Sequence, residues 1–329
     1  MMAPLQKQAD WRGEFEFYRY ALPMRGGGQR EGILLHLRAA DPRTGWGDAV
    51  PLPGWSVESL EDVRRCIKDS ECAAPLPSSL VCAIESARAS VVHSRSKDAG
   101  AKNLSLNALL GGSLRQILEQ AGDALARGCE CLKIKAAGLS VAELVDLISR
   151  ISASAPLHCR FRIDSNRAWD FETALHMAES LKVFPVEYLE EPIRDSSLLP
   201  EFIKRSPIGI ALDETLREVG PAGLTAYKGA VAMVLKPTLM GGFEACAQYA
   251  DAGAALGMAS VVSACYESGV GIYALGQFAL SLPRQAAAGL DTYSRLEEDV
   301  LRERLDLRNF MFCSKTPLPD VDISKLHPL

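Results

Sequence analysis

The chain has 329 residues, of which 48% are hydrophobic and 23% are charged, so it can bury a sizeable core and is not globally disordered. Its 36 basic residues are outnumbered by 41 acidic ones, and the net charge of −5 argues against partners such as nucleic acid or an anionic membrane. No apolar run approaches the roughly 20 residues that cross a bilayer. The first residues also lack the apolar segment of a secretory signal.

The cysteines and histidines do not form a recognisable metal-binding pattern. The nine cysteines are scattered, and Cys129 and Cys131 lack the second pair that a zinc site needs. We therefore expect reduced thiols in a cytoplasmic protein. The five histidines do not cluster either, which argues against a histidine metal site or a histidine-based catalytic triad.

The first hundred residues predict a hairpin followed by helices. Residues 14–20 alternate charged and aromatic side chains, which is typical of a strand, and residues 32–39 form the return strand. Three glycines, 26–28, separate the two strands and fit no phosphate-binding spacing, so they form either a loose loop or a mobile lid. Helical patterns follow over residues 57–69 and 77–94.

From residue 104 the pattern changes to short apolar or β-branched runs, each followed by a helical pattern. The expected strands cover residues 104–107, 131–135, 158–164, 186–190, 209–213, 231–236, 258–263 and 287–291. This alternation predicts an α/β fold, with a (β/α)8-type barrel over residues 104–299 that follows a small α+β domain over residues 1–103. The tail, 300–329, is expected to join this first domain. An open doubly wound sheet is the alternative, but no G-x-G-x-x-G stands between a strand and a helix.

Charged residues end five successive strands of this expected barrel, where chemistry is carried out in such folds. These residues are Lys133 and Lys135, then Asp164, Glu190, Asp213 and Lys236. Three carboxylates converging on one pocket would repel one another unless a cation lies between them. Oxygen ligands alone suit Mg²⁺ or Mn²⁺. The alternative is that the carboxylates pair with lysines and helix N-termini.

The lysines are expected to approach the pocket from two sides. Lys133 and Lys135 are two apart on one strand and share a face, while Lys236 lies four strands further round the ring. A lysine beside a metal-bound carboxylate is placed to remove the proton α to it, and the metal would hold the enediolate that forms.

The segments KIK, DSN, EEP, DET and LKPT, in that order, resemble the enolase superfamily, which uses a lysine or histidine base with Mg²⁺. Within it the chain is most similar to the o-succinylbenzoate synthases of menaquinone biosynthesis, over GWGDAVPLPGWSVESLEDV, SLNALL, FRIDSNRAW, YLEEPI, IALDETLRE and VLKPTLMGG. The resemblance runs from about residue 14 to about residue 295. It implies a lyase that removes water from a small-molecule carboxylate, 2-succinyl-6-hydroxy-2,4-cyclohexadiene-1-carboxylate, to give 2-succinylbenzoate.

The same resemblance implies a role for each matching residue. Lys135 would take the α-proton and return it to the departing hydroxyl, Lys133 would tune Lys135, and Lys236 would stabilise the enediolate from the opposite face. The residues implied to bind Mg²⁺ are Asp164, Glu190 (rather than Glu191) and Asp213. Those implied to orient the ligands and lysines are Asn166 and Glu214. Those implied to contact the substrate's carboxylates are Ser263 and Gly289. The first domain, residues 1–103, would be a capping domain over the pocket, with the 22–30 loop as the lid.

Two alternatives to a synthase are a different enzyme of the same superfamily and a barrel that has lost catalysis. N-acylamino acid racemases and dipeptide epimerases of the superfamily use the same metal and opposed lysines, but they resemble D-x-D where this chain has Gly289-Leu290-Asp291. A second such pair, Asp320 and Asp322, follows the barrel and is interpreted as solvated turn residues. A barrel that has lost catalysis would show damage to a ligand or a lysine, and none is damaged. The oligomeric state is not predicted.

Overall fold

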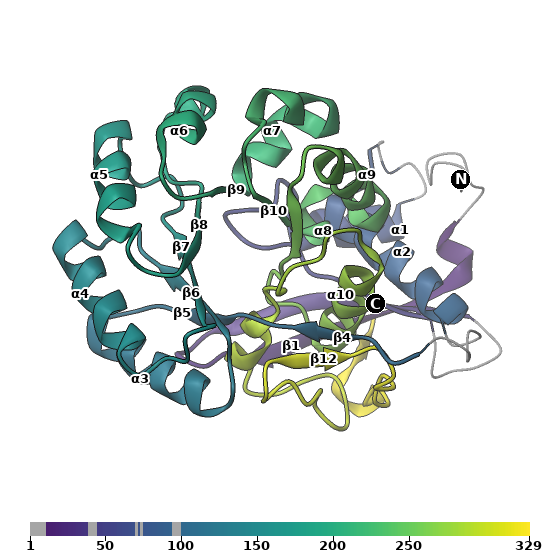
Figure 1. Cartoon of the computed structure of the whole chain (residues 1–329). Coiled ribbons are helices and arrows are strands. Elements are labelled where there is room, and N and C mark those ends of the chain that lie inside the picture. The colour runs from purple at the N-terminus through teal and green to yellow at the C-terminus, as the bar shows by residue number, and fades with distance from the viewer. Residues whose placement is uncertain (1–10, 39–44, 70–71, 73–74, 94–99) are drawn as a thin grey trace.

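The computed structural model describes residues 11–38, 45–69, 72, 75–93 and 100–329 (Figure 1). The first three strands of the described chain and the last one form a four-stranded antiparallel sheet, in the order β13-β1-β2-β3. Its strands are β1 (Phe15–Pro23), β2 (Gln29–Leu37), β3 (Trp46–Ala49) and β13 (His327–Pro328). The expected hairpin is confirmed, because β1 pairs with β2 in register from Phe15–Leu37 to Pro23–Gln29. The N-terminal decapeptide, to which the expectation about a secretory signal applies, lies outside the described residues.

Two helices, α1 (Leu60–Lys68) and α2 (Ser78–His93), pack against this sheet. The N-terminus of α1 is closed by a capping box, in which Ser59 and Asp62 bond each other's backbone N–H groups. Apolar side chains of both helices and of the sheet form one buried cluster, which includes Ile33, Val63 and Ile84. The sheet therefore has a core of its own beside the larger core of the molecule.

Seven parallel strands form the second sheet, in the order β11-β10-β9-β8-β7-β6-β5. Their bounds are β5 (Ala108–Leu110), β6 (Cys131–Lys135), β7 (Arg160–Asp164), β8 (Val186–Glu190), β9 (Ile210–Leu212), β10 (Ala232–Leu235) and β11 (Ala259–Val262). The helices that connect or follow them are α3 (Leu114–Ala126), α4 (Val141–Ser152), α5 (Phe171–Leu181), α6 (Leu199–Arg205), α7 (Glu214–Gly223), α8 (Pro237–Met240), α9 (Gly242–Ala255) and α10 (Gly269–Ser281). Figure 1 shows α3 to α6 on the outside of the strands.

The barrel is closed by an irregular segment rather than by a full eighth βα unit. Ala288 bridges to Leu106, and Gly289 bridges to Ser263, so residues 285–289 join the two edges of the sheet. Isolated bridges at residues 285, 288 and 289 thus replace the regular strand expected over 287–291, and a 3-10 turn, η5 (Asp291–Arg295), stands where an eighth helix was expected. This segment has no apolar helical period that could cover a barrel face, which explains the difference.

The first expected barrel strand, 104–107, is also corrected. Residues Asn103–Ser105 form β4, which pairs antiparallel with β12 (Met311–Cys313), and the barrel strand β5 begins only at Ala108. An apolar run of this length cannot reveal which of two partners it pairs with, because both pairings bury it. The remaining short 3-10 turns are η2 (Trp11–Glu14), η3 (Ser196–Leu198), η4 (Leu224–Tyr227) and η6 (Ile323–Lys325).

The tail returns to the N-terminal sheet, where His327 pairs with Arg19 of β1. The domain boundary after residue 103 stays a prediction. The glycine tip of the hairpin is tied down, since the N–H and Nε of Arg25 donate to Arg295 O and Ser294 O. Its role as a lid also stays a prediction.

The expectation that every cysteine is a free thiol is wrong for one pair. Cys66, in the last turn of α1, and Cys72 are joined by a disulfide, and their Cα atoms are 4.9 Å apart. That separation lies within the range found for disulfide-bonded cysteines. The other cysteines are free thiols, and all but Cys313 are buried. Within the described ranges, no helix has both the length and the apolar character needed to span a bilayer.

Candidate active site

Four side chains meet at the carboxyl ends of β6, β7 and β8. The Nζ atom of Lys133 lies 2.7 Å from Glu190 Oε1 and 3.0 Å from Asp164 Oδ2. The Nζ atom of Lys135 donates to Asp164 Oδ2 over 2.6 Å. The parallel register sets Lys135 beside Asp164 and Asp164 beside Glu190, so strand pairing alone brings these groups together. Both carboxylates are fully buried.

A second pair, Lys236 and Asp213, lies at the ends of β10 and β9. The Nζ atom of Lys236 donates to Asp213 Oδ2. In the sheet order β10 is four strands from β6, so the lysines flank the carboxylates from two sides. Trp55, which precedes α1, also reaches this point, because Lys236 Nζ lies 5.5 Å from the centroid of its indole ring. Arg217 of α7 holds the same loop by donating to Trp55 O over 2.9 Å.

Asn166 and Glu214 connect these groups to one another. Asn166 Oδ1 accepts a hydrogen bond from Lys135 Nζ over 2.9 Å, and the Asn166 N–H donates to Asp164 Oδ1 over 3.1 Å. Asn166 Nδ2 donates to Glu214 Oε1 over 3.3 Å. The Asn166 side chain therefore links Lys135 to Glu214, while its backbone N–H holds Asp164.

The electrostatics keep Lys133 and Lys236 protonated. Burial acts to lower the pKa of Lys133, but Asp164 and Glu190 outweigh it and raise the pKa above its ordinary value. Burial likewise acts to lower the pKa of Lys236, and Asp213 raises it above its ordinary value. Burial acts to raise the pKa of Asp164, yet the lysines of β6 bring it below the usual range. Burial, and then the charge of Asp164, raise the pKa of Glu190.

The three carboxylates fit a hard divalent cation by their chemistry. Asp164, Glu190 and Asp213 are buried and offer only oxygen atoms as ligands, and Glu190 Oε2 makes no hydrogen bond and has the Lys133 ammonium group 2.7 Å away as its ion-pair partner. With the lysine ammonium groups between them, no set of three or more His, Cys, Asp or Glu side chains in the described part of the chain is grouped to hold a metal as it stands. To bind the cation, the carboxylates would have to give up their ion pairs with the lysine ammonium groups.

Ser263 and Gly289 face each other where the closing segment meets β11. Their backbones form a bridge, and Ser263 Oγ lies 3.5 Å from Gly289 O. A Cβ atom on Gly289 would lie 2.9 Å from Ser263 Oγ, closer than such atoms normally approach. The two residues thus lie together at the same end of the barrel strands as Lys236, and their contact with substrate stays a prediction.

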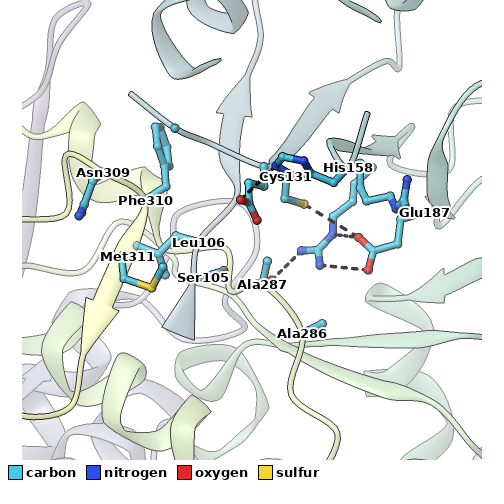
Figure 2. Close-up of a pocket in the computed structure, with 14 residues that line it drawn as sticks. Ser105, Leu106, Cys131, His158, Glu187, Ala286, Ala287, Asn309, Phe310 and Met311 are labelled. Atoms are coloured by element: carbon cyan, nitrogen blue, oxygen red, sulfur yellow. Dashed lines mark hydrogen bonds and ion pairs between the residues drawn. The ribbon is translucent and has the colours of Figure 1, made fainter. Parts of the chain in front are cut away.

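A cavity of about 330 Å³ lies at the opposite end of the barrel (Figure 2). It is lined by Cys131, Arg160 and Glu187, near the N-terminal ends of their strands. Arg162 forms an ion pair with Glu187, with Nε 2.7 Å from Oε2, and its Nη1 donates to Ala287 O over 2.7 Å. The buried Arg162 side chain thus lines this cavity and links β7 to the closing segment.

Sequence reasoning missed Trp55, Arg162 and Arg30. Arg162 interrupts an apolar strand two positions before Asp164, and that interruption was a usable signal. The buried guanidinium of Arg30 donates to Val50 O and Pro51 O and also to Cys265 O, beyond β11. No local pattern announces contacts across such a sequence distance.

Comparisons with known proteins agree with this geometry. Residues 116–317 match the family model described as enolase C-terminal domain-like. The chain is 29% identical to the o-succinylbenzoate synthase of Enterobacter sp. (strain 638), covering 95% of this chain and 98% of that protein. It is 29% identical to the o-succinylbenzoate synthase of Haemophilus influenzae, covering 88% and 92%.

Solved structures of two further enzymes share the fold. The L-Ala-D/L-Glu epimerase from Bacillus subtilis superposes with a TM-score of 0.78 at 18% identity, over 93% of this chain and 96% of that one. The muconate lactonizing enzyme from Pseudomonas putida superposes with a TM-score of 0.77 at 19% identity, over 94% and 97%. At these identities the likeness concerns the fold alone.

Proposed function

The chain belongs to the enolase C-terminal domain-like family, and from that membership we propose that it is an o-succinylbenzoate synthase. The observation that carries the proposal is the pair of lysine sites that flank three buried carboxylates, Lys133 and Lys135 on one side and Lys236 on the other. Full-length similarity to o-succinylbenzoate synthases supports the choice of substrate. The pathway it would serve is menaquinone biosynthesis, in the cytoplasm.

The proposed cofactor is Mg²⁺, with Mn²⁺ as the substitute, held by Asp164, Glu190 and Asp213. When bound, the cation supplies positive charge against which the substrate carboxylate is placed. Asn166 and Glu214 are proposed to orient the groups around it, and their hydrogen bonds to each other and to Asp164 support this role.

The proposed reaction uses the lysines on the two sides of the site. Lys135, 40% exposed at its side chain, is accessible to substrate, and as the free amine it takes the proton α to the carboxylate. Its ammonium form then returns that proton to the hydroxyl on the same face, which leaves as water while the ring becomes aromatic. Lys236 stays protonated and stabilises the negative charge that develops on the substrate from the other side. Ser263 and the backbone at Gly289 are proposed to bind the carboxylates.

A racemase or epimerase is the second candidate, since lysines stand on both sides of the site. The structure gives it less support. Asp291 is already used inside the protein, where its Oδ2 accepts a hydrogen bond from the Leu109 N–H over 2.9 Å. Asp322 caps the η6 turn by accepting from Ser324 N, in the tail. Neither carboxylate is placed by these contacts to grip a substrate ammonium group.

The test is turnover of the cyclohexadiene substrate by purified protein with Mg²⁺, followed by loss of the diene absorbance. Lys135→Ala is expected to lower kcat by about 10²- to 10⁴-fold, because it removes the acid–base group. Lys182→Ala, at an exposed lysine after α5, is the matched control and is expected to leave the rate unchanged. A chelator is expected to abolish turnover.

Absence of turnover by folded, metal-loaded protein would contradict the proposal. Exchange of the α-proton of N-acylamino acids or dipeptides in D₂O would then favour the racemase or epimerase.

A further inference from the structure

Glu191 follows the proposed ligand Glu190 and is as deeply buried, with 1% of its surface exposed. Its carboxylate accepts hydrogen bonds at both oxygens. Oε1 accepts from the N–H groups of Asp213 and Thr215, each over 2.8 Å. Oε2 accepts from Thr215 Oγ1 over 3.0 Å and from Arg167 Nε over 2.9 Å. One side chain at the end of β8 thus holds the backbone at the end of β9 and the start of α7.

Arg167 completes the same connection from the end of β7. Its backbone N–H donates to Glu191 O over 2.8 Å, and its Nη2 donates to Thr215 Oγ1 over 2.9 Å. Its Nη1 pairs with Glu218 on α7. The strand ends that carry Asp164, Glu190 and Asp213 are therefore tied to one another through the ion pair of Arg167 with the buried Glu191 and through its hydrogen bonds.

The backbone at this point adopts a conformation that needs such support. Asn166, Arg167 and Glu191 have φ angles of 47°, 59° and 40°, in the left-handed region that side chains other than glycine rarely adopt. Backbone of this kind persists only where surrounding contacts over-determine it. Its consequence for the site is direct, because the same turn aims the Asn166 N–H at Asp164 Oδ1.

We infer that Glu191, acting with Arg167, is a positioning residue that holds together the strand ends carrying Asp164, Glu190 and Asp213, so that these three carboxylates can bind a divalent cation. The inference rests on the metal site of the proposed function but not on its substrate. Glu191 itself has no lone pair left for the cation, since each of its two carboxylate oxygens already accepts two hydrogen bonds. It acts through the backbone of its neighbours.

The experiment measures Mg²⁺ and Mn²⁺ binding by titration calorimetry, without substrate, for the wild type and Glu191→Gln. Gln keeps the size but loses the charge, and its amide group turns a donor towards either Arg167 or the two backbone N–H groups. We expect the Kd for the cation to rise by about 10- to 100-fold, the usual effect of removing a group that orients a metal ligand. Arg167→Lys, which keeps the charge but not the forked contacts, is expected to weaken binding in the same direction.

Glu218→Gln is the matched control, because it removes the half-exposed partner of Arg167 and leaves Glu191 intact. Its Kd is expected to stay within twofold of the wild type. Thermal unfolding in chelator establishes that each variant is folded at the temperature of the titration. If Glu191→Gln does not fold, the Kd of Arg167→Lys for the cation tests the inference instead.

A folded variant with a lower Tm and an unchanged Kd would overturn the inference and leave Glu191 a purely structural role. A wild type that binds no divalent cation would also overturn it. A wild type that binds the cation but does not turn over the cyclohexadiene would contradict only the proposed substrate.

Discussion

Gly289 occupies a position where the barrel has no room for a side chain. A Cβ atom there would lie 2.9 Å from Ser263 Oγ and 3.3 Å from Ser263 Cβ. We expect Gly289→Ala to lower the free energy of unfolding by about 1–3 kcal/mol, because the closing segment and β11 must move apart. The same change is expected to raise KM, since Ser263 is proposed to contact the substrate. Urea unfolding and steady-state kinetics measure the two effects.

Gly122 provides a control at which alanine is expected to change the free energy of unfolding in the opposite direction. It lies exposed in α3, and nothing is within 4 Å of a Cβ atom added there. Gly122→Ala is expected to raise the free energy of unfolding by about 0.5–1 kcal/mol, since alanine favours a helix over glycine. Equal effects of the two substitutions would show that crowding at Ser263 is not the cause.

At the scale of elements, Asp48 joins β3 to the N-terminus of α10. Its Oδ2 accepts from the Ser268 N–H and Oγ over 2.8 and 2.7 Å, and its Oδ1 accepts from the Tyr20 hydroxyl over 2.8 Å. Ser268, the N-cap of α10, makes no side-chain cap of its own. A carboxylate from the N-terminal sheet therefore holds the N-cap residue of a barrel helix, where negative charge is favourable, while Asp299 Oδ1 accepts from the Gly269 N–H over 2.9 Å.

This contact predicts a pH dependence of stability. Burial raises the pKa of Asp48 from 3.8 to about 6, so the folded state holds a proton that the unfolded state releases. The contribution of Asp48 is thus fully present below pH 4 and is lost as pH rises through 6, an effect of about 3 kcal/mol. We expect Asp48→Asn to gain stability relative to the wild type by about this amount between pH 4 and pH 7.5.

Denaturant unfolding of both proteins across this pH range is the measurement. The comparison cancels the titration of groups that the two proteins share. Parallel stability curves would show that Asp48 titrates normally and that its hydrogen bonds offset the burial.

At the scale of the whole molecule, Arg30 clamps the loop of Trp55 onto the barrel. It is 5% exposed on β2, and its guanidinium donates to Pro51 O over 2.9 Å, to Val50 O over 2.7 Å and to Cys265 O over 3.1 Å. Arg30→Met leaves these carbonyls without a donor. We expect a loss of about 3 kcal/mol in the free energy of unfolding, given the cost of unsatisfied buried groups.

The same substitution is expected to raise KM more than it lowers kcat, because Trp55 beside Lys236 would lose its support. Arg19→Met, at an exposed arginine on β1, is the control and should change stability by less than about 0.5 kcal/mol. A kcat loss without a KM change would place the effect of Arg30 on the chemistry instead of on the loop.

Much of the barrel and of the candidate site was readable in the sequence. Apolar runs ending in Lys135, Asp164 and Glu190 matched strands β6, β7 and β8 to within two residues. Parallel strands end at one edge, so the order of these residues along the chain already determined that they lie side by side. The hairpin and the first two helices could also be predicted from local patterns, since residue alternation, helical period and caps act over a few positions.

Only the tertiary structure decided which distant segments complete the site. Trp55 reaches Lys236, and Glu191 holds the backbone of Asp213, through contacts that leave no periodic trace in the sequence. The eighth unit of the barrel was over-predicted, because closure by residues 285–289 depends on two sheet edges meeting in space. Local patterns specify the elements, whereas packing between segments far apart in the chain selects the partners, and that selection has no signature at the scale of a few residues.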